Sequence, residues 1–168
     1  MTEQRERRLI AEYAIEKLTG YRYVFGHPLG PVAGSLEAEV GLARAIKLSK
    51  PFRPEVDLLC YFGTSLLLIE AKIFRIVDGA AKLSVYKALV PTTPELAPYL
   101  DRPVRMRLVV PWNSVQTQAI ADSQGIEVDI FRPSWVDQYV EQYQQYWTAE
   151  ARTARAEKQR IRTLLGVE

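Results

Sequence analysis

The sequence has one cysteine, Cys60, and one histidine, His27. A single cysteine excludes an intrachain disulfide and a cysteine-based zinc cluster. A single histidine excludes a histidine-rich metal site and argues against a Ser-His-Asp triad. We therefore expect Cys60 to be a buried, unreactive thiol. We expect His27, which stands in a Gly-His-Pro turn, to be structural.

Several sequence patterns are also missing. The sequence contains no GxxxxGK[ST] phosphate-binding loop, no GxGxxG turn and no GxSxG nucleophile elbow. These absences argue against nucleotide-binding folds and α/β-hydrolases. No apolar run reaches the ~18 residues of a membrane span, and the first residues are charged, unlike a signal peptide. We therefore expect a cytoplasmic protein with no membrane association.

The remaining composition is ordinary for a globular protein. The 168 residues are 48% hydrophobic and 25% charged, with 22 basic and 20 acidic side chains. This mildly basic balance permits binding to a polyanion but does not require it. The length favours one core domain. We assign residues 1–133 to this core and residues 134–168 to a C-terminal helix.

The most informative stretch runs from residue 53 to residue 73. Two apolar segments, 53–60 and 66–73, read as strands joined by a tight turn. Side chains alternate along a strand, so Glu55 and Asp57 share one face, as do Glu70 and Lys72. A hairpin brings these faces together. Charged groups in an apolar hairpin are costly unless they hold a metal or do chemistry.

Periodicity and breakers predict the other elements. Helices are expected at 3–18, 36–48 (weakened by Gly41), 78–90 and 114–124, and strands at 21–25, 105–111 and 126–131. Residues 26–34 and the proline-rich segment after residue 90 are predicted loops. The strand, helix and strand over 105–131 indicate a parallel crossover unit. The chain is therefore predicted to be an α/β protein.

Residues 134–165 are predicted to form one long helix. Its first half is rich in aromatic residues at helical spacing, from Trp135 to Trp147, and should pack on the sheet. Its second half gathers basic residues on one side: Arg152, Arg155, Lys158 and Arg162. This half fits a solvated helix end, a phosphate-contacting arm or a self-association helix.

The acids of the hairpin suit a hard divalent cation. Carboxylates of Asp57 and Glu70, on adjacent strands, can ligate Mg²⁺, and the carbonyl of Ala71 can add a backbone ligand. A bound cation acidifies a coordinated water and neutralises charge that builds on a phosphoryl group. Lys72 would lie beside that water and orient it, deprotonate it or stabilise a phosphate oxygen. A depressed pKa would suit Lys72 to such a role.

The pattern Glu-Val-Asp, a short turn and then Leu-Leu-Leu-Ile-Glu-Ala-Lys resembles the PD-(D/E)XK nuclease superfamily. The Holliday-junction-resolvase-like branch is the more similar one, and the order of elements matches over most of residues 3–131. This resemblance implies a restriction-endonuclease-like mixed central sheet flanked by helices. It also implies a DNA endonuclease dependent on Mg²⁺ or Mn²⁺, with Asp57, Glu70 and Lys72 as catalytic residues.

The resemblance extends to neighbouring helices. Lys82 and Tyr86 stand where many relatives have Gln-xxx-Tyr, which implies that Tyr86 supports the site and Lys82 contacts DNA. Lys87 and the basic residues of the C-terminal helix are further expected DNA contacts. Relatives often place a metal-binding glutamate on the first helix, and two residues suit that place, Glu12 and Glu16. If the 36–48 helix is instead the equivalent one, Glu37 or Glu39 takes this role.

Three functions fit the sequence. The first is an endonuclease that cuts branched, recombining or invading DNA, as a homodimer because two cuts need two sites. The second is a non-catalytic assembly or scaffold protein on the same fold, within a phage or mobile-element complex, which the long C-terminal helix favours. The third is a nuclease subunit that needs a protein partner for targeting, which the modest net charge favours. An exposed ion pair between Asp57 and Lys72 is the purely structural alternative.

Overall fold

The computed structural model describes residues 2–146 and 148–164. Contacts within the chain divide it into two units, Met1–Phe131 and Arg132–Glu168. The first unit contains the whole sheet and the hairpin on which the sequence prediction depends.

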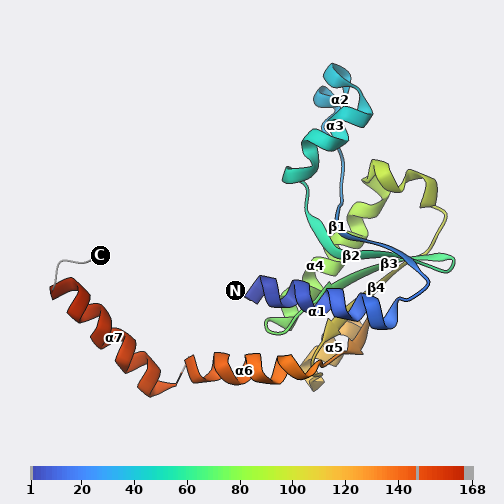
Figure 1. Ribbon diagram of the computed structural model, residues 1–168. Helices are drawn as coiled ribbons and strands as arrows, with labels where there is room; N and C mark the ends of the chain where they lie inside the picture. Colours follow the sequence, from blue (N-terminus) through green and yellow to red (C-terminus); the bar gives the residue numbers. More distant parts are fainter. Residues whose placement is uncertain (1, 147, 165–168) are drawn as a thin grey trace. The chain divides into compact units, whose positions relative to one another are not determined.

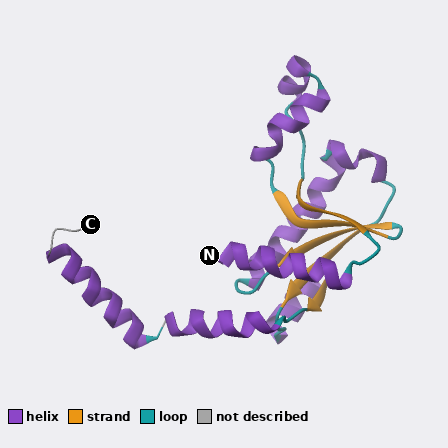
Figure 2. Cartoon of the chain, in the orientation of Figure 1, coloured by secondary structure: helices purple, strands orange, loops and turns teal. Residues whose placement is uncertain are grey.

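The first unit is built on a five-stranded sheet in the order β1-β2-β3-β4-β5 (Figures 1 and 2). The strands are β1 Arg22–Pro28, β2 Glu55–Phe62, β3 Ser65–Ala71, β4 Val104–Val110 and β5 Ile126–Ile130. The first three strands pair antiparallel, whereas β4 and β5 continue the sheet in parallel. The predicted α/β class with a mixed central sheet is confirmed, and so is the parallel unit over residues 105–131.

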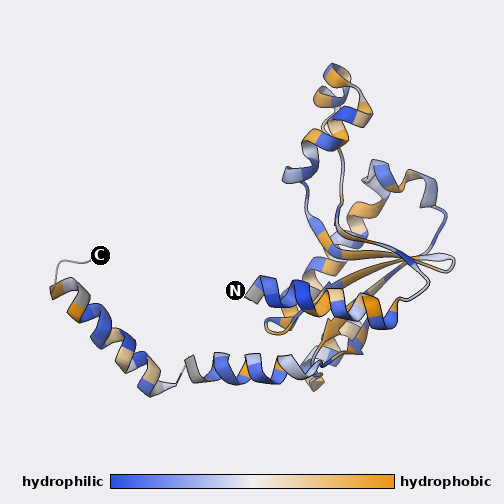
Figure 3. Cartoon of the chain, in the orientation of Figure 1, coloured by the Kyte–Doolittle hydropathy of each residue, from blue (hydrophilic) through white to orange (hydrophobic). Residues whose placement is uncertain are grey.

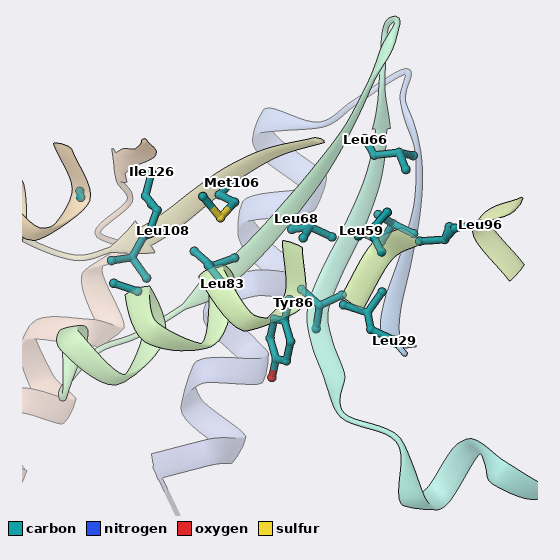
Figure 4. Packing of buried hydrophobic residues seen from close by; sticks show 14 of the residues in the cluster. Leu29, Leu59, Leu66, Leu68, Leu83, Tyr86, Leu96, Met106, Leu108 and Ile126 are labelled. Carbon is teal, nitrogen blue, oxygen red and sulfur yellow. The ribbon is translucent and has the colours of Figure 1, made fainter. Parts of the chain in front are cut away.

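Helices cover both faces of this sheet. On one face lies α1 (Thr2–Lys17), and on the other lie α4 (Ile76–Leu89) and α5 (Val115–Gln124) (Figures 1 and 4). The face toward α4 carries the main apolar cluster, in which Leu59 and Leu68 of the hairpin meet Leu83 of α4. Leu59 and Leu68 are directly paired across β2 and β3, so this strand register places both side chains in the cluster. Asp57 and Glu70 lie on that same face, two positions farther along each strand.

The hairpin is tighter than the predicted turn at 61–65. Phe62 pairs with Ser65, so only Gly63 and Thr64 form the turn. Gly63 has φ of 59°, the backbone that two-residue hairpin turns require. The strands are therefore longer than expected, which leaves the predicted site at their far end.

Two local predictions are wrong. The helix expected at 36–48 is divided into α2 (Gly34–Val40) and α3 (Leu42–Ser49), because Gly41 has φ of 77°. The Gly-His-Pro turn is instead the end of β1, where His27 pairs with Val56. Pairing with β2 outweighs the local turn signal of glycine and proline. The proline-rich segment holds two short 3₁₀ helices, η2 (Val90–Thr92) and η3 (Pro94–Tyr99), and a third, η1 (Lys50–Phe52), follows α3.

The second unit contains two helices where one was predicted, α6 (Ser134–Tyr146) and α7 (Ala149–Leu164). The hydroxyl of Thr148 accepts a hydrogen bond from the backbone N–H of Ala151 at 3.2 Å, which is an N-cap contact that starts a new helix. Most of α7 is hydrophilic (Figure 3). Trp147 lies outside the described residues, and packing of the aromatic half on the sheet stays a prediction. No helix in the described ranges is long and apolar enough to cross a membrane.

Candidate active site

The far end of the hairpin holds Asp57 on β2, with Glu70 on β3 and Lys72 just after it. The Asp57 carboxylate accepts a hydrogen bond from the backbone N–H of Ala71 at 2.9 Å. This bond orients one carboxylate oxygen toward the neighbouring strand. The contact of Ala71 is thus made by its N–H, and the predicted metal-binding role of its carbonyl stays a prediction.

Glu70 is fully buried. Its Oε1 lies 3.3 Å from the ammonium of Lys72 and 3.3 Å from that of Lys82. Its Oε2 is buried and has no hydrogen-bond partner. Burial first, and then the negative charge of Asp57, raise the pKa of Glu70 above its usual value, although both lysines oppose the shift. The site therefore holds a carboxylate whose charge the protein only partly balances.

Lys72 is held between two acids. Its ammonium lies 2.9 Å from Oε2 of Glu6, on α1, and 3.3 Å from Oε1 of Glu70. The other oxygen of Glu6 accepts the backbone N–H of Ile73 at 3.3 Å. Burial lowers the pKa of Lys72, but Glu70 and Glu6 raise it by more, so its pKa lies above the usual value. The depressed pKa of Lys72 was expected beside a bound metal and stays a prediction.

Glu6 is the acid that the sequence prediction missed. Glu12 pairs with Arg8 at 2.7 Å and Glu16 pairs with Lys17 at 2.9 Å, and neither is brought to Lys72. Glu37 and Glu39 lie on α2 and do not line the cleft around Lys72. A signal for Glu6 was present. Glu6 stands three residues before Leu9 and four before Ile10. Both of these residues are buried, so Glu6 shares the apolar face of α1.

Gly79 lets α4 approach the site closely. A Cβ atom at this position would lie 2.8 Å from the Cγ of Lys72 and 2.8 Å from a methyl group of Leu108. It would also lie 3.6 Å from the Cγ of Glu70. Helix α4 therefore packs directly on the aliphatic parts of Lys72 and Glu70. It covers the site on the face of the sheet that carries the apolar cluster.

The other predicted residues of α4 have different surroundings. Tyr86 is buried in the apolar cluster, and Figure 4 shows its hydroxyl pointing away from the labelled leucines. Burial first, then the charges of Glu70 and Asp57, raise the pKa of Tyr86 to about 12. Tyr86 thus lies within electrostatic reach of the site. Lys82 pairs with Glu70 but keeps 51% of its side chain exposed, whereas Lys87 is exposed and does not line the cleft.

A cleft of about 590 Å³ opens over these residues. It is lined by Glu6 of α1, by Asp57 of the hairpin and by both lysines, Lys72 and Lys82. Glu55 also lines it, beside Asp57. Glu70 lies beneath this surface, because its side chain has no exposed area.

The predicted basic residues of the C-terminal helix belong to the second unit. Arg152, Arg155 and Lys158 lie on α7. The side chain of Arg162 lies outside the described residues. Their predicted contact with DNA stays a prediction.

The donor set fits a hard divalent cation. The described residues contain no group of three or more His, Cys, Asp or Glu side chains arranged for a metal. The set here is two carboxylates, Asp57 and Glu70, and Mg²⁺ commonly keeps several waters when so few protein oxygens bind it. The buried, unpartnered Oε2 of Glu70 and the repulsion from Asp57 are both relieved by added positive charge.

Several solved structures are similar to this chain. A repair endonuclease from Pyrococcus abyssi is 14% identical, with a TM-score of 0.45, and the match covers 75% of this chain and 46% of that one. EndoMS in a complex with double-stranded DNA is 17% identical, with a TM-score of 0.47, over 76% and 45%. A protein of unknown function is 10% identical, with a TM-score of 0.43, over 73% and 56%.

The chain spans about half the length of these solved proteins. No family model and no curated protein matches the sequence. At this level of similarity, the function has to be argued from the residues of the site.

Proposed function

We propose that this chain is a DNA endonuclease that hydrolyses phosphodiester bonds with the help of Mg²⁺ or Mn²⁺. One observation carries the proposal: the buried Glu70 carboxylate, with one oxygen unpartnered, stands beside Asp57 and Lys72 under an open cleft.

A purely structural ion-pair network explains this arrangement poorly. Buried polar groups that serve stability are normally fully hydrogen-bonded, because an unpaired buried acceptor costs about 1–3 kcal/mol. Apolar residues in place of a buried ion pair are often neutral or stabilising. Here one oxygen of Glu70 stays unpaired and a second carboxylate adds repulsion. A cost of this kind is typical of a functional site.

Three groups would hold the cation: the carboxylates of Asp57 and Glu70 and the carbonyl of Ala71. When bound, the cation supplies an acidified water and neutralises negative charge on the phosphoryl group. The hydrogen bond from the Ala71 N–H restrains the carboxylate of Asp57. Restraint of this kind favours one ligand geometry before substrate arrives.

Lys72 acts on the phosphate in this proposal. In hydrolysis, a water oxygen bonds to phosphorus and gives up a proton to solvent, while the bond from phosphorus to the leaving sugar oxygen breaks and that oxygen takes up a proton from solvent. Negative charge then grows on the non-bridging oxygens, and a nearby ammonium stabilises it. Glu6 holds Lys72 at 2.9 Å from the α1 side, so the lysine stays beside the two carboxylates.

We further propose that Lys82 exchanges Glu70 for a DNA phosphate once the cation is bound. Its ammonium is within 3.3 Å of Glu70, yet half of its side chain is exposed. The divalent cation would supply the positive charge that Glu70 loses with Lys82, so the buried carboxylate is not left uncompensated. Released from Glu70, Lys82 lies at the cleft and can contact a DNA phosphate.

The test is cleavage of supercoiled plasmid and of a synthetic four-way junction with Mg²⁺ or Mn²⁺. Asp57→Ala and Lys72→Ala should abolish cutting, while the matched controls Glu12→Gln and Lys17→Ala should cut at the wild-type rate. Binding of Mn²⁺, followed by electron paramagnetic resonance, should be lost in Asp57→Ala and kept in Glu12→Gln. Full activity in both cleft variants would assign the cutting to a contaminant.

The same assays separate the alternatives. A non-catalytic assembly protein would bind no Mn²⁺ and cut no DNA. A subunit that needs a partner would bind Mn²⁺ through Asp57 but cut only with the partner present. The proposal also includes a homodimer, since two cuts need two sites, and light scattering of the purified protein measures its mass.

A further inference from the structure

The segment between α2 and β2 carries unbalanced positive charge. From Val40 to Pro54 the sequence has Arg44, Lys47, Lys50 and Arg53 and no acidic residue. We call residues 42–54 the basic arm. Arg44, Lys47 and Lys50 are exposed, and none of them forms an ion pair within the described residues. Arg44 and Lys47 are three residues apart on α3 and therefore lie on neighbouring positions of one helix face.

A phenylalanine stands at the end of the basic arm. Phe52 has 88% of its surface exposed, the largest fraction among the large hydrophobic side chains that the structure describes. Scattered apolar side chains on a surface need no explanation. A nearly fully exposed ring in the same short segment as three exposed cations is a more specific combination.

The backbone next to Phe52 is held firmly. Arg53 is almost fully buried and makes two hydrogen bonds to the carboxylate of Glu95, at 2.7 and 2.9 Å. Pro51 and Pro54 stand on either side of Phe52 and Arg53 and restrict the backbone there. The ring of Phe52 is thus presented from an anchored backbone, which lowers the entropy cost of binding a partner.

The basic arm also adjoins the candidate active site. Lys50, two residues before Phe52, lines the same cleft as Asp57 and Lys72. Phe25 of β1 lines this cleft too and is 47% exposed. A ligand chain that passes over Asp57 would therefore meet aromatic surface and a cation on the β1 side. In Figure 1, α2 and α3 extend away from the sheet, so the arm is open to such a ligand.

An exposed ring among exposed cations fits one ligand chemistry well. Nucleic acid offers negative phosphates at regular spacing and flat base surfaces, and stacking of a base on an aromatic side chain tolerates any sequence. In an intact duplex the base surfaces are covered by their neighbours, so a ring can stack only where bases are unpaired. A second copy of the chain fits poorly, because a two-fold contact would place these cations against their own equivalents.

We propose that the basic arm binds unpaired nucleotides, with Phe52 stacked on a base and Arg44, Lys47 and Lys50 on the flanking phosphates. The substrate of the site then has a single-stranded segment next to the bond that is cut. This statement about the substrate rests on the proposed nuclease function, whereas binding by the arm does not.

Binding is tested first without metal, so that cleavage plays no part. A fluorescein-labelled 30-nucleotide oligo-dT strand and its duplex with oligo-dA are titrated in EDTA, and anisotropy gives both affinities. Phe52→Ala and Phe52→Leu should weaken binding of the single strand by about tenfold or more, and Phe52→Tyr should keep it. Duplex binding should change less than twofold. Val115→Ala, another highly exposed apolar side chain, is the matched control.

Cleavage is then measured with Mg²⁺ on a duplex that carries a single-stranded flap. The wild type should cut the flap substrate faster than the plain duplex, and Phe52→Leu should lose most of this preference. Stacking of Phe52 on DNA is overturned if Phe52→Leu binds the single strand as tightly as the wild type does. It is also overturned if the substitution weakens single-strand and duplex binding equally, or if Phe52→Ala lowers the oligomeric mass. If Phe52-dependent binding is found but nothing is cut, the nuclease function fails and the binding site stands.

Discussion

At the scale of single residues, Glu70 shows the conflict between stability and function most directly. Its carboxylate is fully buried, faces a second carboxylate and has one unpartnered oxygen. The raised pKa means that the folded protein binds a proton on Glu70 more tightly than the unfolded chain does. Folding stability of the metal-free protein therefore falls as pH rises from the ordinary glutamate range through the raised pKa.

The first prediction concerns Glu70→Gln. The variant lacks this loss of stability, so in EDTA its melting temperature should exceed that of the wild type by about 2–4 °C at pH 8, the shift that about 1 kcal/mol gives in a chain of this size. The gain should shrink toward pH 4.5. Thermal denaturation across this pH range, with Glu12→Gln as control, measures it. A lower melting temperature at every pH would contradict the assigned electrostatics.

The second prediction concerns Glu6. Glu6→Gln removes the anionic partner of Lys72, so kcat for cutting should fall about tenfold (about 1.4 kcal/mol) with little change in KM. Glu12→Gln, on the same helix but paired with Arg8, should leave both constants unchanged. Equal rates in Glu6→Gln and the wild type would show that Lys72 needs no help from α1.

The sequence predicted part of this site because its chemistry is local. Asp57, Glu70 and Lys72 belong to one hairpin, and strand alternation alone places the two acids on one face. Glu6 belongs to a helix 66 residues earlier, and α1 carries four glutamates that composition does not distinguish. Only the apolar face of α1 indicates which of them turns inward. The unpaired oxygen of Glu70 depends on packing in three dimensions, so no sequence pattern predicts it.

At the scale of elements, α4 determines how closely the site is covered. Its Gly79 packs on the stems of Lys72 and Glu70, where even one methyl group would meet atoms at 2.8 Å. Glycine in a helix costs about 1 kcal/mol relative to alanine, so its presence here is explained by the close approach and not by helix formation.

Gly79→Ala is therefore the third prediction. The added methyl group should destabilise the fold by about 1–3 kcal/mol despite the better helix propensity. It should also weaken Mn²⁺ binding, because the stem of Lys72, which is paired with Glu70, has to shift. Gly34→Ala, at a helical glycine with open space around it, should be neutral or stabilising. Chemical denaturation measures the free energy of unfolding of both variants. Equal stabilisation of Gly79→Ala and Gly34→Ala would show that the site accommodates a methyl group at position 79.

The elements themselves were predicted where apolar periodicity is strong. The hairpin, α4, α5 and the last two strands follow from alternation and helical spacing. In the structure, the hydroxyl of Ser114 accepts the N–H of Thr117 at 3.1 Å and so caps α5. The errors occur where a single residue competes with the pattern. Gly41 divides one predicted helix, Thr148 starts a new helix inside another, and β2 pairs with residues that resemble a turn.

At the scale of the whole molecule, the chain consists of two units, and the catalytic candidates belong to the first. In α7, no residue whose side chain the structure describes is buried. This helix therefore contributes little to the stability of the chain through its own burial.

The fourth prediction is that a chain ending at Thr148 keeps the melting temperature of the full chain within about 2 °C, less than 1 kcal/mol for this size. If Arg152, Arg155 and Lys158 contact phosphates, the truncated chain should bind duplex DNA with a weaker salt dependence. The slope of log K against log salt should change by about 0.9 for each lost contact. An unchanged slope would remove α7 from the DNA contacts, and a large loss of stability would show that it belongs to the folded core.

The two-residue turn of the hairpin has a consequence for the order of folding. Asp57 and Glu70 meet when this short hairpin closes, a step that takes microseconds, whereas Glu6 stands 66 residues before its partner Lys72. A cation bound by the hairpin would thus already be bound in the folding transition state, and α1 would dock after that state. Mg²⁺ should then speed refolding, and Glu6→Gln should mainly speed unfolding, a difference that stopped-flow measurements resolve.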